Sequence, residues 1–249
     1  MNRLSIVILT SNQLELTKGC LEALEDLSRI PGYEIILVDN GSTDGTPGVI
    51  PGLFPWVKFI PLPENIGVAR GRNIGVGSAT ADVIMLLDND TLPATGAILA
   101  LEDYLRSNPD CGVVAPRLVD ADGHTQQSFK EFPGLFLKMR NWLFSRKDSG
   151  NDIDTDKELE PFYVIGAAQM FRKEDFLRAG GLDENIFFGP EDADFCMAVR
   201  RNGKRIVYYP AVFIIHYWQR STSGRKFSRR AWLHIKALLY FYRKHRRFI

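Results

Sequence analysis

The feature that most constrains the fold of this chain is the alternation, in its first half, of short apolar runs with longer segments of helical periodicity. The runs are too short for helices and are typical of strands buried on both faces of a sheet. We expect these strands at residues 4–9, 34–39, 57–60 and 83–87. We expect helices at residues 14–27, 65–79 and 94–107. Such alternation predicts an α/β fold with a mostly parallel central sheet and helices on both faces.

Local signals refine these boundaries. Ser11 and Asn12 precede the first helix and are residue types that cap helix N-termini. A loop rich in Pro and Gly is expected before the third strand. The second half is less regular, with strands expected at 113–116, 162–171, 205–209 and 212–217 and helices at 173–179, 190–202 and 228–246. Between residues 118 and 160 we expect a turn, an apolar and basic stretch at 132–144 and a polar loop at 148–160.

The charge of the chain is distributed unevenly. The 249 residues carry a net charge of +1, so the overall balance indicates no particular partner. No Asp or Glu follows Asp194, however, whereas 14 of the 31 Lys and Arg residues do. A basic C-terminal region favours an anionic surface or substrate, and the absence of a recognisable reader motif argues against nucleic acid. No apolar run approaches the roughly 20 residues that a membrane-spanning helix needs.

Two carboxylates follow the fourth expected strand, in the sequence Leu87-Asp88-Asn89-Asp90-Thr91. Side chains two residues apart on a strand point to the same side. The carboxyl edge of the strands is where open α/β sheets bind ligands. Like charges this close repel each other unless a cation or strong donors lie between them. The pair therefore predicts a divalent metal site, of the kind that usually holds a diphosphate.

Asp39 ends the second expected strand and precedes a turn-forming stretch, Asn40 to Thr46. Its carboxylate can accept a hydrogen bond from a nucleobase N–H or a ribose hydroxyl, or it can simply cap its own turn. The stretch Asn65 to Gly75 mixes Gly, Asn and two Arg residues. Arginine there can clamp a phosphate, and the glycines also suit a helix packed tightly on the sheet.

Two further positions point to chemistry. Asp192 shares a helix face with Phe195, Cys196 and Val199, while Glu191 and Asp194 lie on either side of that face. An ionised carboxylate on an inward face is explained by a general base that faces a pocket, although acids in a first turn also compensate the helix dipole. His216 ends an apolar strand, where a lone histidine is more often a core residue than a ligand.

Taken together, these motifs resemble those of a known enzyme family. In order along the chain they are Val38 to Asp44, Asn65 to Gly75, Asp88-Asn89-Asp90, Gly166-Ala167-Ala168, Gly181 to Glu184, Phe188 to Phe195 and His216. The series resembles the family 2 glycosyltransferases with the GT-A fold, and looks most like their rhamnosyltransferase-like members. The likeness covers residues 3–218.

The resemblance implies a role for each matching residue. It implies that Thr10, Asn12, Asp39, Asn65, Arg72 and Asp88 bind the nucleotide-sugar donor. It implies that Asp88, Asp90 and His216 hold Mn²⁺ or Mg²⁺ and that Asp192 is the catalytic base. It further implies one domain over residues 1–218, with a nucleotide-sugar-binding half at about 1–117 and a smaller, mixed acceptor-side half at 118–218, followed by a basic C-terminal helix at 219–249.

The expected function is therefore an inverting, metal-dependent transfer of a sugar from a UDP- or dTDP-sugar, with dTDP-rhamnose a candidate, to a hydroxyl acceptor in polysaccharide or lipid-linked glycan assembly. Two alternatives remain, a sugar-phosphate nucleotidyltransferase and a non-catalytic nucleotide-sugar-binding module. The first usually carries a Gly-rich basic signature near its N-terminus, which Leu9 to Gln13 lacks.

Two expectations concern location. The dispersed Cys20, Cys111 and Cys196 suit buried thiols in a reducing compartment, so we expect a cytoplasmic protein. The tail from Arg225 to Arg247 interleaves aromatic and basic residues. It is expected either to lie on the anionic inner face of a membrane or to pack on the domain with its basic edge in water.

Overall fold

A computed structural model describes residues 2–130, 156–217 and 229–245 of the chain. The strands of its main sheet are β1 (Leu4–Thr10), β2 (Tyr33–Asp39), β3 (Lys58–Pro61), β4 (Val83–Asp88), β5 (Thr91–Leu92), β6 (Cys111–Val119), β7 (Thr125–Gln126), β10 (Ala168–Arg172) and β11 (Arg205–His216). A second, two-stranded sheet pairs β8 (Phe129–Lys130) with β9 (Tyr163–Val164). The helices are α1 (Leu14–Ala23), α2 (Glu25–Ser28), α3 (Thr46–Leu53), α4 (Val68–Ser78), α5 (Thr95–Ser107), α7 (Lys173–Arg178), α8 (Glu191–Arg201) and α9 (Arg229–His245).

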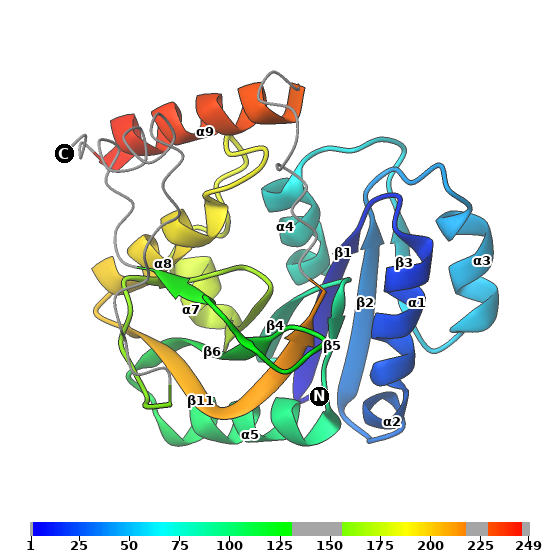
Figure 1. The fold of residues 1–249 in the computed structure, drawn as a ribbon, viewed down its shortest axis with the longest axis horizontal. Coiled ribbons are helices and arrows are strands. Elements are labelled where there is room, and N and C mark those ends of the chain that lie inside the picture. Colours follow the sequence, from blue (N-terminus) through cyan, green and yellow to red (C-terminus); the bar gives the residue numbers. More distant parts are fainter. Residues whose placement is uncertain (1, 131–155, 218–228, 246–249) are drawn as a thin grey trace.

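The main sheet runs in the order β3-β2-β1-β4-β10-β6-β11-β5, with β7 added on β6. The first four strands are mutually parallel, as the alternating pattern predicts. Strand β10 is antiparallel to both β4 and β6, while β6 and β11 are parallel to each other. The expected α/β class is therefore confirmed, and the second half adds the mixed part of the sheet. Because β10 pairs directly with β4, the two halves share one sheet (Figure 1).

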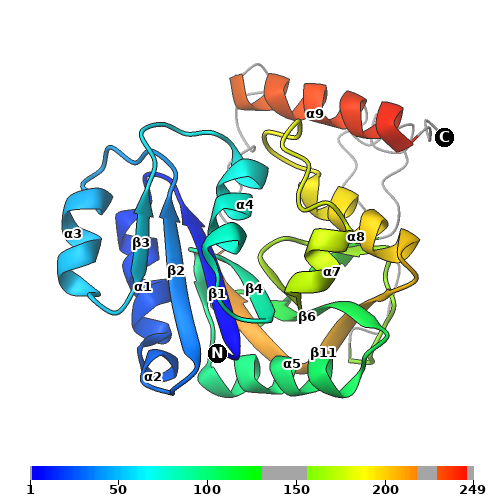
Figure 2. The same ribbon diagram turned by 180° about the vertical axis from the view of Figure 1, so that it is seen from behind.

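Strand alternation divides the buried side chains between two cores, one on each face of the sheet. On β4, Val83, Met85 and Leu87 enter the core covered by α1, α2 and α5. Ile84 and Leu86 enter the other core, which α4, α7, α8 and α9 cover (Figure 2). By the same alternation, Asp88 at the end of β4 belongs to the α4 side. The sequence thus aims one carboxylate of the acidic pair at α4.

Some boundaries differ from the expectations, for local reasons. The helix expected at 14–27 breaks after Ala23 into α1 and α2. Its expected caps were wrong: Asn12 has a φ of 55°, and the Leu14 N–H donates instead to Asp44 Oδ2, at 2.9 Å. The other oxygen of Asp44 accepts from the Thr46 N–H, at 3.2 Å, at the start of α3, a helix that stands where a loop was expected. The Asp44 carboxylate therefore accepts backbone N–H groups at the N-termini of both α1 and α3. The sequence around Leu14 gives no sign of this, because Asp44 lies 30 residues further along the chain.

The second half shows similar differences. The strand expected at 162–171 is divided into β9 and β10, and the two strands expected at 205–217 form the single bulged strand β11. The stretch 132–144, and most of the loop expected at 148–160, lie outside the described residues. Cys20, Cys111 and Cys196 are buried free thiols, as expected.

Helix α4 packs closely on the sheet because glycines face β1 and β2. A Cβ atom on Gly75 would collide with the side chain of Val7 and press on Val38, and one on Gly71 would collide with Leu9. A Cβ on Gly77, in contrast, would meet nothing within 4 Å. The tight packing suggested by the sequence is confirmed, and it sets the distance between α4 and the carboxyl end of β4.

Gly75→Ala should destabilise the fold by about 1–3 kcal/mol, because overpacking forces the helix from the sheet. Gly77→Ala is the matched control and should stabilise it by about 0.5–1 kcal/mol, since only the helix propensity changes. Urea unfolding of both variants measures the difference. Equal stabilities would show that α4 does not depend on this close approach.

Candidate active site

The acidic turn after β4 is held by its central asparagine. Asn89 is buried, and its side-chain N–H groups donate to the hydroxyls of Thr10, at 3.2 Å, and Thr17, at 3.0 Å. Thr10 and Thr17 are 2.8 Å apart and hydrogen-bonded to each other beneath the turn. Because Asn89 is anchored inside, Asp88 and Asp90 face the carboxyl edge of the sheet. The structure thus places Thr10, expected to bind the donor, in the buried support of the acidic turn.

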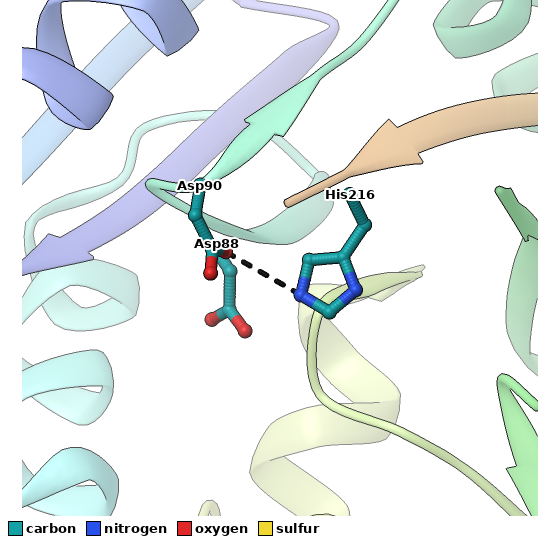
Figure 3. Close-up of side chains that lie close together, drawn as sticks. All are labelled: Asp88, Asp90 and His216. Atoms are coloured by element: carbon teal, nitrogen blue, oxygen red, sulfur yellow. Dashed lines mark ion pairs between the residues drawn. The ribbon is translucent and has the colours of Figure 1, made fainter. Parts of the chain in front are cut away.

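Sheet pairing brings His216 to this turn. His216, the last residue of β11, pairs with Thr91 of β5, and the Tyr217 N–H donates to the Asp90 carbonyl at 2.8 Å. The imidazole is buried, and its Nε2 lies 3.4 Å from Asp90 Oδ1 (Figure 3). One ligand atom each from Asp88, Asp90 and His216 falls within 4.8 Å of the others. His216 is therefore both buried, as a core histidine would be, and directed at the acidic pair.

The donor chemistry of this cluster fits a divalent cation. Two carboxylates and one imidazole are a mixed oxygen and nitrogen set, which suits Mn²⁺ better than Mg²⁺. Asp88 is also the partner of a buried cation, since Arg72 Nη2 donates to its Oδ1 at 2.5 Å. Among the described residues no Arg or Lys forms an ion pair with Asp90, whose Oδ1 faces His216 Nε2. The fit is therefore strongest for Asp90 and His216, with Asp88 shared between Arg72 and the cation position.

Arg72 links the acidic turn to the start of α8. Its side chain is 5% exposed, and it also donates to the Gly166 carbonyl at 2.9 Å and lies 3.8 Å from Glu191 Oε1. A Cβ on Gly166 would collide with the Arg72 guanidinium and would have to displace it. The Gly166 N–H in turn donates to Asp192 Oδ2 at 3.3 Å. The metal candidates and the candidate base are thus connected through Arg72 and Gly166.

The two adjacent carboxylates at the start of α8 have different surroundings. Asp192 is half-buried and accepts hydrogen bonds from the Gly166 and Ala193 N–H groups. Glu191 is 7% exposed, and its Oε2 accepts no hydrogen bond from the described residues. Burial, and then the charge of Asp192, raises the pKa of Glu191 to about 7, against the opposing charge of Arg72. Asp192 is therefore the more accessible acceptor for a proton.

Helical periodicity predicted that Asp192 faces inward and that Glu191 and Asp194 lie beside that face. The structure shows the opposite order of burial, because Glu191 and Asp194 are buried and Asp192 is only half-buried. Asp194 is 2% exposed because α9 covers it: Lys244 Nζ lies 2.9 Å and His245 Nε2 2.7 Å from its carboxylate. Glu191 is covered by Arg72 of α4. The flanking acids are buried by elements distant in sequence, which a helical wheel does not contain.

The candidate nucleotide-binding residues meet at the ends of β1 and β2. Asp39 is 1% exposed; its Oδ1 accepts from the Ser42 N–H at 3.1 Å, as a turn cap does, whereas its Oδ2 accepts no hydrogen bond from the described residues. Asn12 accepts from the Thr43 N–H at 2.6 Å. Asn65 donates to Ser11 Oγ at 3.1 Å and so joins the α4 side to the loop after β1. The Oδ2 of Asp39 is thus a buried acceptor that has no hydrogen-bond partner among the described residues.

Sequence reasoning missed several supporting residues. Asn40 is buried and joins Asn65 and the Gly67 carbonyl, and Gln126 contacts the ring and the carbonyl of His216. Asn89 and Gly166 were seen only as parts of motifs. An amide directly between two carboxylates was a usable signal for Asn89, but nothing near Gln126 in the sequence points to His216.

A sequence profile described as glycosyl transferase family 2 matches residues 5–178 of the chain. The chain belongs to glycosyl transferase family 2. This assignment covers the acidic turn, Asp39 and Arg72, and confirms the resemblance drawn from the motifs.

Two named glycosyltransferases are similar over most of the chain. It is 28% identical over 207 residues to an N-acetylglucosaminyl-diphospho-decaprenol L-rhamnosyltransferase of Mycobacterium tuberculosis, covering 76% of this chain and 67% of that protein. It is 24% identical to the amylovoran biosynthesis glycosyltransferase AmsE of Erwinia amylovora, covering 90% of this chain and 77% of the relative.

Solved structures confirm the GT-A fold of this family 2 chain. A mannosyltransferase from Pyrobaculum calidifontis, in complex with GDP-Man and Mn²⁺, superposes with a TM-score of 0.63 at 20% identity, over 88% of this chain and 58% of that one. TarS of S. aureus, residues 1–349, gives a TM-score of 0.63 at 18% identity, over 86% of this chain and 60% of that one. The chain thus spans about three fifths of the length of these structures.

Glu191 gives the fold a measurable pH dependence. Its pKa rises from 4.5 to about 7 on folding, so between these values the folded state holds a proton that the unfolded state releases. Stability should therefore fall as the pH rises through this window, by at most about 3 kcal/mol. Glu191→Gln should remove this fall, whereas Glu22→Gln on the exposed face of α1 should keep it. Urea unfolding at about pH 5 and about pH 8 tests this; a fall of equal size in Glu191→Gln would contradict it.

Proposed function

We propose that the chain is an inverting, metal-dependent transferase that moves a sugar from a nucleoside-diphosphate donor to a hydroxyl acceptor. The observation that carries the proposal is the gathering of Asp88, Asp90 and His216 within 4.8 Å of one another. The unsatisfied Oδ2 of Asp39 lies at the same carboxyl edge of the sheet, two strands from Asp88 across β1. We take the donor to be a UDP- or dTDP-sugar, with dTDP-rhamnose favoured by the relative named as a rhamnosyltransferase.

In this proposal the side chains divide the reaction between them. Asp39 accepts from the nucleoside, while Asn12 and Asn65 hold the loops around it. Asp88, Asp90 and His216 would hold Mn²⁺ or Mg²⁺, and the ion would supply positive charge to stabilise the departing diphosphate. Arg72 neutralises Asp88 and keeps it in place. Asp192 removes the proton of the acceptor hydroxyl as its oxygen attacks the anomeric carbon from the face opposite the diphosphate, so one displacement inverts the configuration.

The two alternatives make different use of the same residues. In a nucleotidyltransferase, a phosphate oxygen of the sugar phosphate attacks a phosphorus atom, so no base aimed at an acceptor hydroxyl is needed. A binding module needs no base at all. Asp192, half-buried and fixed by Gly166, is explained by transfer to a hydroxyl. Release of pyrophosphate from a nucleoside triphosphate would favour the first alternative, and tight donor binding without turnover would favour the second.

Asp192→Asn should lower transfer by at least about 10²–10⁴-fold, because an amide cannot take the proton. Donor affinity should change by no more than a few-fold, since the residue acts on the acceptor. Calorimetric titration with a panel of nucleotide sugars in Mn²⁺ and a transfer assay separate the two effects. Asp103→Asn, an exposed acid on α5, is the control. Lost donor binding in a folded Asp192→Asn protein would contradict the assignment.

We further propose that the acceptor is lipid-linked and that α9 touches the membrane surface. The inner face of α9 packs on the domain through Ala237, Phe241 and Tyr242, and this packing leaves its outer face free to touch a membrane. Its outer face exposes Trp232, Ile235 and Leu239, at 61, 51 and 53%, at helical spacing. No helix among the described residues is long and apolar enough to cross a bilayer.

Charge favours a bilayer over a protein as the occupant of this face. Lys236 and Arg243 are exposed one helical turn beyond Trp232 and Leu239, and Lys236 lies 5.5 Å from the Trp232 ring. An apolar stripe alternating with cations, on a helix whose own sequence contains no Asp or Glu, suits anionic lipid headgroups. Helix α9 lies over α8, with His245 in contact with Asp194 in the first turn of α8 and with Arg201 at its end, on the same side of the molecule as α4 (Figure 2). A contact there would bring Asp192 toward a lipid-linked acceptor.

Replacing Trp232, Ile235 and Leu239 by Ser should reduce binding to anionic vesicles by at least about 10-fold, because the apolar surface that enters the interface is removed. Leu53→Ser with Leu177→Ser, equally exposed on α3 and α7, is the control. Co-sedimentation with phosphatidylglycerol and phosphatidylcholine vesicles measures the difference. Equal sedimentation of the triple variant and the control would contradict the membrane contact. So would a wild-type dimer that the triple variant cannot form, because a second copy of the chain would then cover this face of α9.

A further inference from the structure

Gln126 makes two hydrogen bonds to the same histidine. Its side-chain Nε2 donates to the His216 backbone carbonyl at 2.8 Å, and its Oε1 lies 2.8 Å from His216 Nδ1. These two contacts fix the orientation of the amide. A carbonyl oxygen only accepts, so the NH₂ end of the amide must face it, and the oxygen end must face the ring.

The orientation of the amide decides which ring nitrogen carries the proton. The amide oxygen only accepts, so Nδ1 of His216 must be the donor, as N–H. A neutral imidazole has one N–H, which leaves a lone pair on Nε2. That atom lies 3.4 Å from Asp90 Oδ1, which is also an acceptor. Two acceptors at this distance are stabilised by a cation between them, and the lone pair on Nε2 is the one a metal uses.

A rigid hairpin sets the position of Gln126. Strand β7 pairs with β6, with Gln126 opposite Leu118. The turn between them is closed by Asp120, whose backbone N–H donates to the His124 carbonyl at 2.9 Å and whose Oδ1 accepts from the His124 N–H at 2.9 Å. Since β6 also pairs with β11, Gln126 and His216 are held by the same sheet.

We propose that Gln126 is a positioning residue that keeps His216 in the Nδ1–H tautomer and so presents Nε2 to a divalent cation shared with Asp88 and Asp90. The inference rests on the metal site of the proposed function, and it assigns that site a residue outside the metal-ligand cluster. The competing arrangement is a doubly protonated His216 that forms an ion pair with Asp90 and needs no metal.

Nuclear magnetic resonance of the ring nitrogens tests the tautomer directly. In ¹⁵N-labelled protein the His216 signals, identified by their loss in His216→Asn, should show a protonated Nδ1 and an unprotonated Nε2 in the absence of donor. A protonated Nε2, in either the other tautomer or the charged ring, would overturn the inference. This measurement needs no substitution at Gln126 and no turnover.

Metal affinity tests the consequence. Mn²⁺ binding, measured by electron paramagnetic resonance of the free ion without donor or acceptor, should weaken about 10- to 100-fold in Gln126→Leu. Gln126→Glu keeps an acceptor for Nδ1–H and should recover most of that loss. Gln127→Leu is the matched control. The side chain of Gln127, the next residue, is exposed, so this variant should bind Mn²⁺ as the wild type does.

The outcomes separate this inference from the function it rests on. Wild-type affinity in a folded Gln126→Leu protein, checked by thermal unfolding, would overturn the role of Gln126 alone. If Gln126→Leu does not fold, the test uses Gln126→Glu alone. A loss of Mn²⁺ affinity of about 10- to 100-fold in a folded Gln126→Glu protein would then overturn the role of Gln126. A wild-type protein with no affinity for Mn²⁺, even with a bound nucleotide sugar, would contradict the proposed metal-dependent function, whatever the tautomer of His216.

Discussion

One buried guanidinium connects the segments that form the site. Arg72 of α4 binds Asp88 at the end of β4, the carbonyl of Gly166 before β10, and Glu191 at the start of α8. A buried charge is stable only with such partners, because leaving it unpaired costs several kcal/mol. The ion pairs therefore fix α4, β4 and α8 relative to one another. The glycines of α4 and the missing Cβ at Gly166 are the steric conditions that let Arg72 reach all three.

Because of the order of strands in the sheet, both halves of the chain contribute side chains to the same edge. Strands β1, β2 and β4 end side by side, so Asp39 at the end of β2 and Asp88 at the end of β4 lie at the same edge. Strand β11 crosses from the other half and brings His216 against Asp90 through β5. Helix α8 adds Asp192 from the side that α9 covers. In the proposed reaction, the cluster of Asp88, Asp90 and His216 and the carboxylate of Asp192 would act on opposite sides of the anomeric carbon.

Much of the fold followed from local patterns, and the errors share a cause. The parallel strands, α4, α5, α8 and α9 were predictable because apolar periodicity reports which face of an element is buried. The cap of α1 was not, because Asp44 reaches it from 30 residues along the chain. The burial of Asp194 by α9 was missed for the same reason. Each error concerns a partner that lies outside the local window.

The sequence by itself determined the α/β class and the placement of Asp39 and Asp88 at the carboxyl edge of the sheet, since strand alternation and chain order are enough to derive both. Only the tertiary structure decided which of these side chains meet. The sequence favoured a core histidine at His216, and only the pairing of β11 with β5 directed its ring at the acidic pair. Gln126 carried no signal until the hairpin placed it beside that ring. The physical reason is that side-chain periodicity is a local property, whereas ligand geometry depends on hydrogen-bonded register between strands about 90 or more residues apart.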